Sequence, residues 1–118
     1  MDLTDNIKNL DNLNAYKTRV QYLKGETIFK QGAFAPYVMY VVEGLVKVYL
    51  QTGIDKNTSI SVAAEGEFLA FSSVFGEPVH TYSAQAISNT EICMIEKESL
   101  KKILLENPEF ALQITSQN

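Results

Sequence analysis

The sequence has 118 residues, of which 46% are hydrophobic and 20% are charged, and its formal net charge is -4. This length fits one domain, and the composition is that of a globular protein rather than a disordered segment. The longest basic run is Lys101-Lys102, so we do not expect these residues to bind nucleic acid, which requires a basic surface. Because Cys93 is the single cysteine, an internal disulfide and a four-cysteine metal cluster are excluded.

The N-terminal segment is polar and acidic and has no apolar stretch of signal-peptide length. No window of the chain approaches the ~20 apolar residues that a membrane-spanning helix requires. We therefore expect a cytoplasmic protein with no membrane partner. Ile7, Leu10 and Leu13 follow one another at the spacing of one helical face, which predicts a short amphipathic helix over residues 5–15.

From residue 18 to residue 96 the apolar period changes to two, which is typical of strands with one buried face. Glycine-containing turn signals separate these runs at intervals of roughly 7 to 13 residues, as in an antiparallel sandwich or barrel. The sequence therefore predicts a mainly β fold, a double-stranded β-helix (jelly roll) of about eight antiparallel strands with flanking short helices. The positions expected to face inward include Val20 and Tyr22; Val46, Val48 and Leu50; and Ile60 and Val62, with Lys47 and Tyr49 facing outward.

Helical spacing returns after the last strand. Leu100, Ile103 and Leu104 lie on one helical face, which leaves Lys101 and Lys102 as solvated side chains on the other face. Before this helix, Cys93 stands in the apolar run 92–95, where we expect a buried thiol.

A second helix is predicted to begin at residue 108. Asn107 is suited to an N-cap and Pro108 to the first helical position. The chain ends at Asn118, about two turns later. We therefore expect residues 1–118 to be a single effector domain and a fragment of a longer protein.

Four glycine-containing segments occur in the order found in one known family. Residues 25–32 follow the pattern G-E-x-I-x-x-x-G, and residues 37–48 look like the next strand pair with its Glu-Gly turn. Residues 66–70 (GEFLA) resemble the start of a phosphate-binding cassette, and residues 83–84 resemble its end. The chain thus resembles the cyclic-nucleotide-binding-like sensory domain of the Crp/Fnr bacterial transcription regulators over residues 20–118.

This resemblance implies a ligand site with altered chemistry. Relatives that bind cyclic AMP hold the ribose with a glutamate and the cyclic phosphate with an arginine, whose two parallel N–H donors suit the anion. Here those positions are Phe71 and Tyr82, which predicts that cyclic AMP does not bind. The expected ligand-binding residues are Gly66, Glu67, Phe68, Leu69, Ala70, Phe71, Ser72, Ser73, Val74, Tyr82, Ser83 and Ala84.

The residues leave three states of this site open. A short helix over residues 71–75 could offer the N–H groups of Ser72 and Ser73 to an anion, with the Ser83 hydroxyl as a further donor. The site could instead take an unknown apolar or aromatic effector, or it could be empty because its side chains simply fill the barrel. The apolar and aromatic side chains in question are Phe68, Leu69, Phe71, Val74, Phe75 and Tyr82.

His80 is the single histidine, and we expect it to be a solvated loop side chain. One histidine cannot build the metal site of a cupin enzyme, nor the catalytic arrangements that combine histidine with serine or cysteine. We therefore expect no metal, no cofactor and no enzymatic activity.

The same resemblance implies the partners. The helix from residue 108 would continue into a dimerisation helix, so the full-length protein would be a homodimer. DNA would be bound only by a C-terminal domain that this chain lacks, and an unknown small-molecule effector would bind the roll. The alternative interpretation is a cyclic-nucleotide-binding regulatory module of a kinase or channel, which sequence beyond Asn118 would decide.

Overall fold

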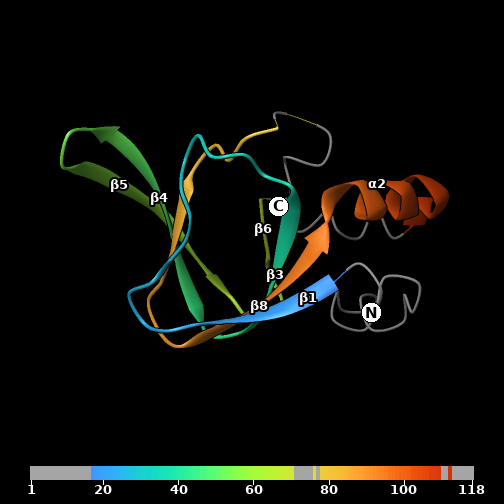
Figure 1. Cartoon of the computed structure of the whole chain (residues 1–118), viewed down its shortest axis with the longest axis horizontal. Coiled ribbons are helices and arrows are strands. Elements are labelled where there is room, and N and C mark those ends of the chain that lie inside the picture. Colours follow the sequence, from blue (N-terminus) through green and yellow to red (C-terminus); the bar gives the residue numbers. More distant parts are fainter. Residues whose placement is uncertain (1–16, 71–75, 77, 110–111, 113–118) are drawn as a thin grey trace.

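The computed structural model describes residues 17–70, 76, 78–109 and 112. In this part of the chain eight strands precede a helix (Figure 1). The strands are β1 (Lys17–Tyr22), β2 (Thr27–Phe29), β3 (Tyr37–Glu43), β4 (Leu45–Gly53), β5 (Lys56–Ala64), β6 (Phe68–Leu69), β7 (Ser83–Ala86) and β8 (Thr90–Glu96), and the helix is α2 (Lys97–Glu106).

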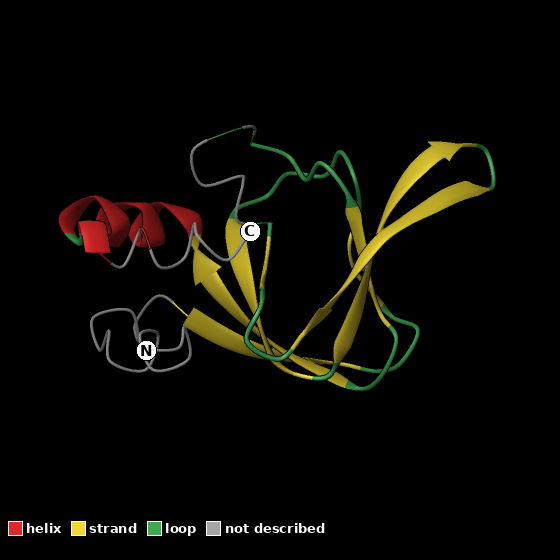
Figure 2. Ribbon diagram, turned by 180° about the vertical axis from the view of Figure 1, so that it is seen from behind, coloured by secondary structure: helices red, strands yellow, loops and turns green. Residues whose placement is uncertain are grey.

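The strands form two four-stranded sheets, one in the order β1-β8-β3-β6 and the other in the order β2-β7-β4-β5. All pairings between these strands are antiparallel. Figure 2 shows the two sheets facing each other, with α2 beside the first sheet and outside the roll. This arrangement confirms the predicted mainly β jelly roll. The helix expected over residues 5–15 lies outside the described residues.

Strands β3 and β8 are buried on both faces. One face of the sheet they share packs against α2, and the other faces the interior of the roll. Because successive side chains of a strand point to opposite faces, this double burial explains why both strands are nearly continuous apolar runs. The helix-side cluster consists of Val38, Tyr40, Cys93, Ile95, Leu100, Ile103 and Leu104, with Val42 and Phe68 packed against it.

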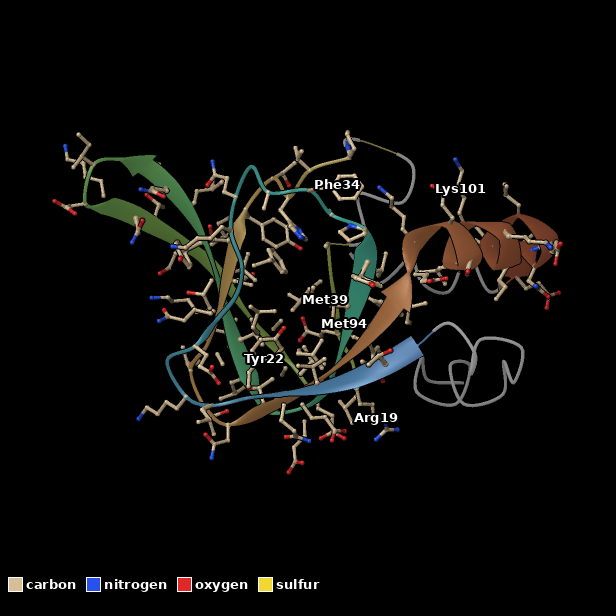
Figure 3. The ribbon with its side chains drawn as sticks, in the orientation of Figure 1. Arg19, Tyr22, Phe34, Met39, Met94 and Lys101 are labelled. Atoms are coloured by element: carbon tan, nitrogen blue, oxygen red, sulfur yellow. The ribbon has the colours of Figure 1, made fainter. Side chains whose placement is uncertain are left out.

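The second core lies between the two sheets. Figure 3 shows Tyr22, Met39 and Met94 directed into this space, whereas Arg19 and Lys101 point away from it. The interior cluster consists of Phe29, Met39, Val41, Val46, Val48, Ala63, Leu69, Ala70, Ala84 and Ile92, with Tyr22, Ile28, Tyr82 and Met94 partly buried against it.

Gly44, at the turn between β3 and β4, is required for two reasons. Its φ of +104° lies in the left-handed region, where a side chain is strained. An added Cβ would also lie 2.7 Å from the carbonyl oxygen of Asn89 and 2.8 Å from Cα of Thr90. Any side chain at position 44 would therefore clash with the backbone of Asn89 and Thr90.

The predictions for the C-terminal part and for Cys93 are confirmed where the structure describes them. Cys93 is buried, and α2 buries its predicted apolar face. Asn107, expected to begin the next helix, closes α2: its side-chain Nδ2 donates to the carbonyl oxygen of Ile103 at 2.9 Å. Pro108 and Glu109 are helical, and most of the helix predicted from there lies outside the described residues.

The prediction for β5 is wrong. Ile60 and Val62 are 52% and 51% exposed, and Ala63 is the buried residue of this strand. The reason is the register, because directly opposite residues share one face of a sheet. Val62 pairs with Lys47, Ala63 pairs with the buried Val46, and Ile60 stands at the register shift between Ser59 and Ser61. Tyr49, expected to face outward, is buried, and a register shift of the β4–β5 pairing between Val48 and Tyr49 interrupts the simple alternation.

Candidate functional site

The candidate site begins at the turn that leads into β6. Gly66 donates its N–H to the carbonyl oxygen of Val41, and Val41 donates to the carbonyl oxygen of Glu67, both at 2.9 Å. Gly66 has a φ of +92°, and open space surrounds an added Cβ except for the Tyr40 hydroxyl at 3.9 Å. Backbone conformation, rather than a close neighbour, therefore explains this glycine. Glu67 is exposed beside it.

Phe68 and Leu69, the two residues of strand β6, face opposite sides of the sheet. Leu69 belongs to the interior cluster, but Phe68 packs against the helix-side cluster, with its ring 5.2 Å from the ring of Tyr40 at 70°. The expectation that both side chains line one pocket is therefore wrong for Phe68. The physical reason is strand alternation, because neighbouring residues of an extended chain face opposite sides of the sheet.

Tyr82 faces the interior and holds the end of β6. The backbone N–H of Ala70 donates to the Tyr82 hydroxyl oxygen at 2.6 Å, and Ala70 adopts a left-handed φ of +61° that is uncommon for a residue other than glycine. Burial raises the pKa of the Tyr82 hydroxyl, and the Ala70 hydrogen bond opposes part of this effect. Tyr82 therefore presents a protonated, uncharged hydroxyl.

His80 is buried, at 5% exposure, so the expectation of a solvated side chain is wrong. Its ring stacks on the ring of Phe29 with a centroid distance of 3.8 Å and an interplanar angle of 9°. The ring of Tyr82 also contacts Phe29, with a centroid distance of 5.5 Å. We call Phe29, His80 and Tyr82 the inner aromatic group. No pattern in the sequence distinguishes His80, because it follows a short loop segment rather than a periodic strand.

The imidazole of His80 has a buried nitrogen atom that the surrounding described residues do not pair. Its Nδ1 atom is buried and has no hydrogen-bond partner among the residues that the structure describes. Burial lowers the pKa of His80, and the positive charge of Lys97 lowers it further. The side chain is therefore neutral at physiological pH, with one nitrogen able to donate and the other able to accept a hydrogen bond.

Ser83 and Ala84, predicted to end the phosphate-binding cassette, are the first two residues of β7. Ser83 is fully buried, and its hydroxyl oxygen accepts the backbone N–H of Gln31 at 2.9 Å, while Ala84 belongs to the interior cluster. Phe71, Ser72, Ser73, Val74 and Phe75 lie outside the described residues, so the expected meeting of Phe71 and Tyr82 is not tested. Among the residues that the structure does describe, no group of histidine, cysteine and carboxylate side chains could hold a metal ion.

A hydrogen-bonded loop connects the candidate site to α2. His80 donates its N–H to Ala33, and Ala35 donates to Pro78, both at 2.8 Å. At the other end of this loop, Lys97, the first residue of α2, donates its N–H to Pro36 at 3.0 Å. The segment next to the inner aromatic group therefore lies one loop away from the start of the helix.

The two antiparallel sheets and their positive-φ glycine turns define the class of fold, a small β-roll domain. Residues 19–107 match the sequence profile of the cyclic nucleotide-binding domain. The chain therefore belongs to the cyclic nucleotide-binding domain family. Within the helices described by the structure, none combines the length and apolar character needed to cross a membrane.

The chain is also similar to two regulatory proteins. The chain is 26% identical over 96 residues to the nitrogen fixation regulation protein FixK of Bradyrhizobium diazoefficiens, covering 81% of this chain and 39% of FixK. It is 28% identical over 115 residues to the transcriptional activator protein Anr of Pseudomonas protegens, covering 97% of this chain and 47% of Anr. It thus spans less than half the length of either relative.

Solved structures agree with this assignment. The sensor domain of the transcriptional regulator DNR from Pseudomonas aeruginosa superposes with a TM-score of 0.83 and 25% identity, covering 93% of this chain and 74% of that one. The catabolite activator protein of Thermus thermophilus shares the fold, with a TM-score of 0.79 and 22% identity, over 93% of this chain and 52% of that one. The chain therefore shares its fold with the sensor domain of one transcriptional regulator and with a catabolite activator protein.

Proposed function

We propose that this domain senses a small-molecule effector for a Crp/Fnr-type transcription regulator, and that the effector is not cyclic AMP. The observation that carries the proposal is the placement of Tyr82. At the position where the family resemblance expects a phosphate-binding arginine, an uncharged hydroxyl faces the interior cluster and accepts the N–H of Ala70.

The energetic argument concerns the cyclic phosphate. An anion moved from water into an apolar interior needs a cation or several N–H donors to replace its hydration. A neutral tyrosine in place of arginine removes the charge, and a charge-assisted hydrogen bond contributes about 1.5–3 kcal/mol. At about 1.4 kcal/mol for each factor of ten, this loss alone weakens binding roughly tenfold to a hundredfold. Phe71 removes the ribose-binding carboxylate in addition.

The proposed signal leaves the site through the loop at residues 33–36. An effector beside the inner aromatic group would alter the segment at residues 78–80, which is hydrogen-bonded to this loop. The loop in turn holds the first residue of α2. For the effector to act as a signal it must bind one arrangement of these parts more tightly than the other, by about 1–3 kcal/mol in ordinary cases.

The rest of the proposal concerns the longer protein. We infer that a helix from residue 108 continues into a dimer interface, that a further domain binds DNA, and that the protein acts in the cytoplasm without catalysing a reaction. The names of FixK, Anr and DNR as regulators support this inference. They do not favour the alternative of a kinase or channel module.

The proposal is tested by calorimetric titration of the domain with cyclic AMP. We expect no saturable heat up to about 1 mM ligand, the concentration that corresponds to about -4 kcal/mol of binding free energy. A cyclic-AMP-binding relative titrated under the same conditions serves as the positive control. A dissociation constant in the micromolar range for this domain would contradict the proposal.

A further inference from the structure

The inner aromatic group contains a polar atom that the described fold does not use. Nδ1 of His80 is buried without a hydrogen-bond partner, although the residue is only 5% exposed. Buried polar groups in folded proteins are nearly always paired, and exceptions point to a ligand, an ordered water or a functional constraint. Nδ1 of His80 is therefore available to pair with a bound molecule.

The fold keeps His80 in this position. Its backbone is hydrogen-bonded on both sides, because His80 donates to Ala33 and accepts from Gly32, each at 2.8 Å. Its ring is stacked on Phe29, a member of the interior cluster. Turning the imidazole outward to water would break this stacking, so the unpaired Nδ1 is built into the folded structure.

The surroundings of His80 restrict the chemistry of the missing partner. Tyr82 contributes an uncharged hydroxyl, and its oxygen already accepts the N–H of Ala70. Among the described residues, the charge of Lys97 acts on His80, and the Lys97 Nζ lies 5.8 Å from the centre of the exposed Phe34 ring. The inner aromatic group thus offers ring faces and two neutral hydrogen-bonding groups, which suit a flat, uncharged molecule.

We propose that Nδ1 of His80 is a direct effector contact, and that the effector class is an uncharged aromatic molecule with a hydrogen-bonding group of the phenol type. This inference rests on the proposed function and names the chemistry of that same site. The ring of such a molecule would contact Phe29 and Tyr82, and its polar group would pair with Nδ1. A phenol suits either tautomer of the imidazole, since its hydroxyl can both donate and accept.

The experiment uses the fact that the chain has one histidine. Long-range ¹H–¹⁵N NMR spectra of the histidine-labelled protein then report Nδ1 of His80 without assignment. We use three probes that share one ring: phenol, toluene without the hydroxyl, and benzoate with a negative charge. We expect a saturable shift of Nδ1 with phenol, at least tenfold weaker binding of benzoate, and no comparable Nδ1 shift with toluene.

The matched variant is His80→Phe, which keeps an aromatic ring against Phe29 and removes both nitrogens. We expect phenol to bind this variant at least fivefold more weakly than the wild type, while toluene binds both proteins equally, as followed by backbone amide shifts. Should the variant fail to fold, the comparison of phenol with toluene at Nδ1 of the wild type decides the question alone.

Three results would each overturn the inference: no saturable phenol shift at Nδ1, equal phenol affinity in wild type and variant, or benzoate binding as tightly as phenol. Cyclic AMP added to the same sample separates this inference from the proposed function. Micromolar binding of cyclic AMP contradicts the proposed function, whereas failure of the phenol arms without cyclic-AMP binding contradicts the His80 assignment only.

Discussion

The two sides of the sheet that contains β3 and β8 are packed with different chemistry. The helix-side cluster is apolar apart from the groups of Tyr40 and Cys93, and three buried side chains of α2 complete it. The interior cluster carries at its border the inner aromatic group, with a buried imidazole and a partly buried phenol. One side is a largely apolar core, and the other has buried polar atoms at its border.

Under the proposed function, one strand pair serves both stability and sensing. A core of aliphatic side chains contributes most when it is fully closed, as around Leu100 and Ile95. Buried hydrogen-bonding groups add little to stability and are costly when unpaired. The unpaired Nδ1 of His80 therefore fits the proposed binding role better than a role in folding. Substitutions on the two sides should separate these roles.

The largest effect is expected on the helix side, from Leu100→Ala. Leu100 is fully buried between α2 and the sheet, and removal of such a leucine costs about 3 kcal/mol of unfolding free energy through lost burial and the cavity left behind. Urea unfolding followed by circular dichroism measures the change. Leu105→Ala, at a site that is 68% exposed, serves as the control and should change stability by less than about 0.5 kcal/mol.

The comparison requires that Leu100→Ala leave the inner aromatic group intact. The NMR signal of His80 in the folded variant should therefore keep its wild-type position. A large shift of that signal would show that the two sides are not independent, and the proposed separation of packing from sensing would then be wrong.

A smaller effect is expected in the interior, from Tyr82→Phe. This change keeps the ring but removes the oxygen that accepts the N–H of Ala70. One intramolecular hydrogen bond contributes about 0.5–1.5 kcal/mol of net stability, and we expect a loss of this size for the variant. Chemical denaturation measures it. Tyr49→Phe is the control. The Tyr49 hydroxyl accepts from Lys30 at 3.5 Å, beyond the usual length of a hydrogen bond, so the variant should lose less stability than Tyr82→Phe.

Much of this architecture could be predicted from the sequence because local rules decide it. Alternation in β1 and β4, helical spacing in α2 and the left-handed glycines each depend on a few neighbouring residues. Gly25, Gly32, Gly44 and Gly66 all have positive φ, and their order along the chain was enough to indicate the family. The assignment of Tyr82 to the position of the phosphate-binding arginine stays a prediction.

The rest depends on contacts between distant segments. His80 is buried because residues 78–80 pair with the loop at residues 32–35. The residues next to His80 in the sequence do not predict that pairing. Phe68 faces α2 because β6 pairs with β3 in one particular register, and a shift of one residue would reverse it. Ile60 and Val62 look like core residues in the sequence, but the register of β5 on β4 pairs Val62 with Lys47 and leaves Ile60 at a bulge.

The pH dependence of stability sharpens the interior side of the comparison. The pKa of His80 lies below its usual value of 6.5, chiefly because of burial. Above pH 6.5 the group is neutral in both states, so its contribution to stability is fully present. Below pH 6.5 the unfolded chain binds a proton that the folded chain resists, so stability falls as the pH drops towards the lowered pKa.

We therefore expect wild-type stability to decline more steeply than that of His80→Phe between about pH 7 and pH 5. Urea midpoints of both proteins measured across this range provide the difference, in which the carboxylates common to both cancel. Parallel curves would show that His80 is not buried as a neutral group. Such a result would also remove the contrast between the two sides of the sheet.

The smallest effect is expected outside both clusters, from Val62→Thr. Val62 is 51% exposed on the edge strand β5, and threonine keeps the branched shape that suits a strand. The change in unfolding free energy should therefore be below about 0.5 kcal/mol. Val46→Thr is the matched control, because it places the same hydroxyl in a fully buried position of the interior cluster. It should cost at least about 1.5 kcal/mol, and equal effects at the two sites would mean that β5 is covered in solution.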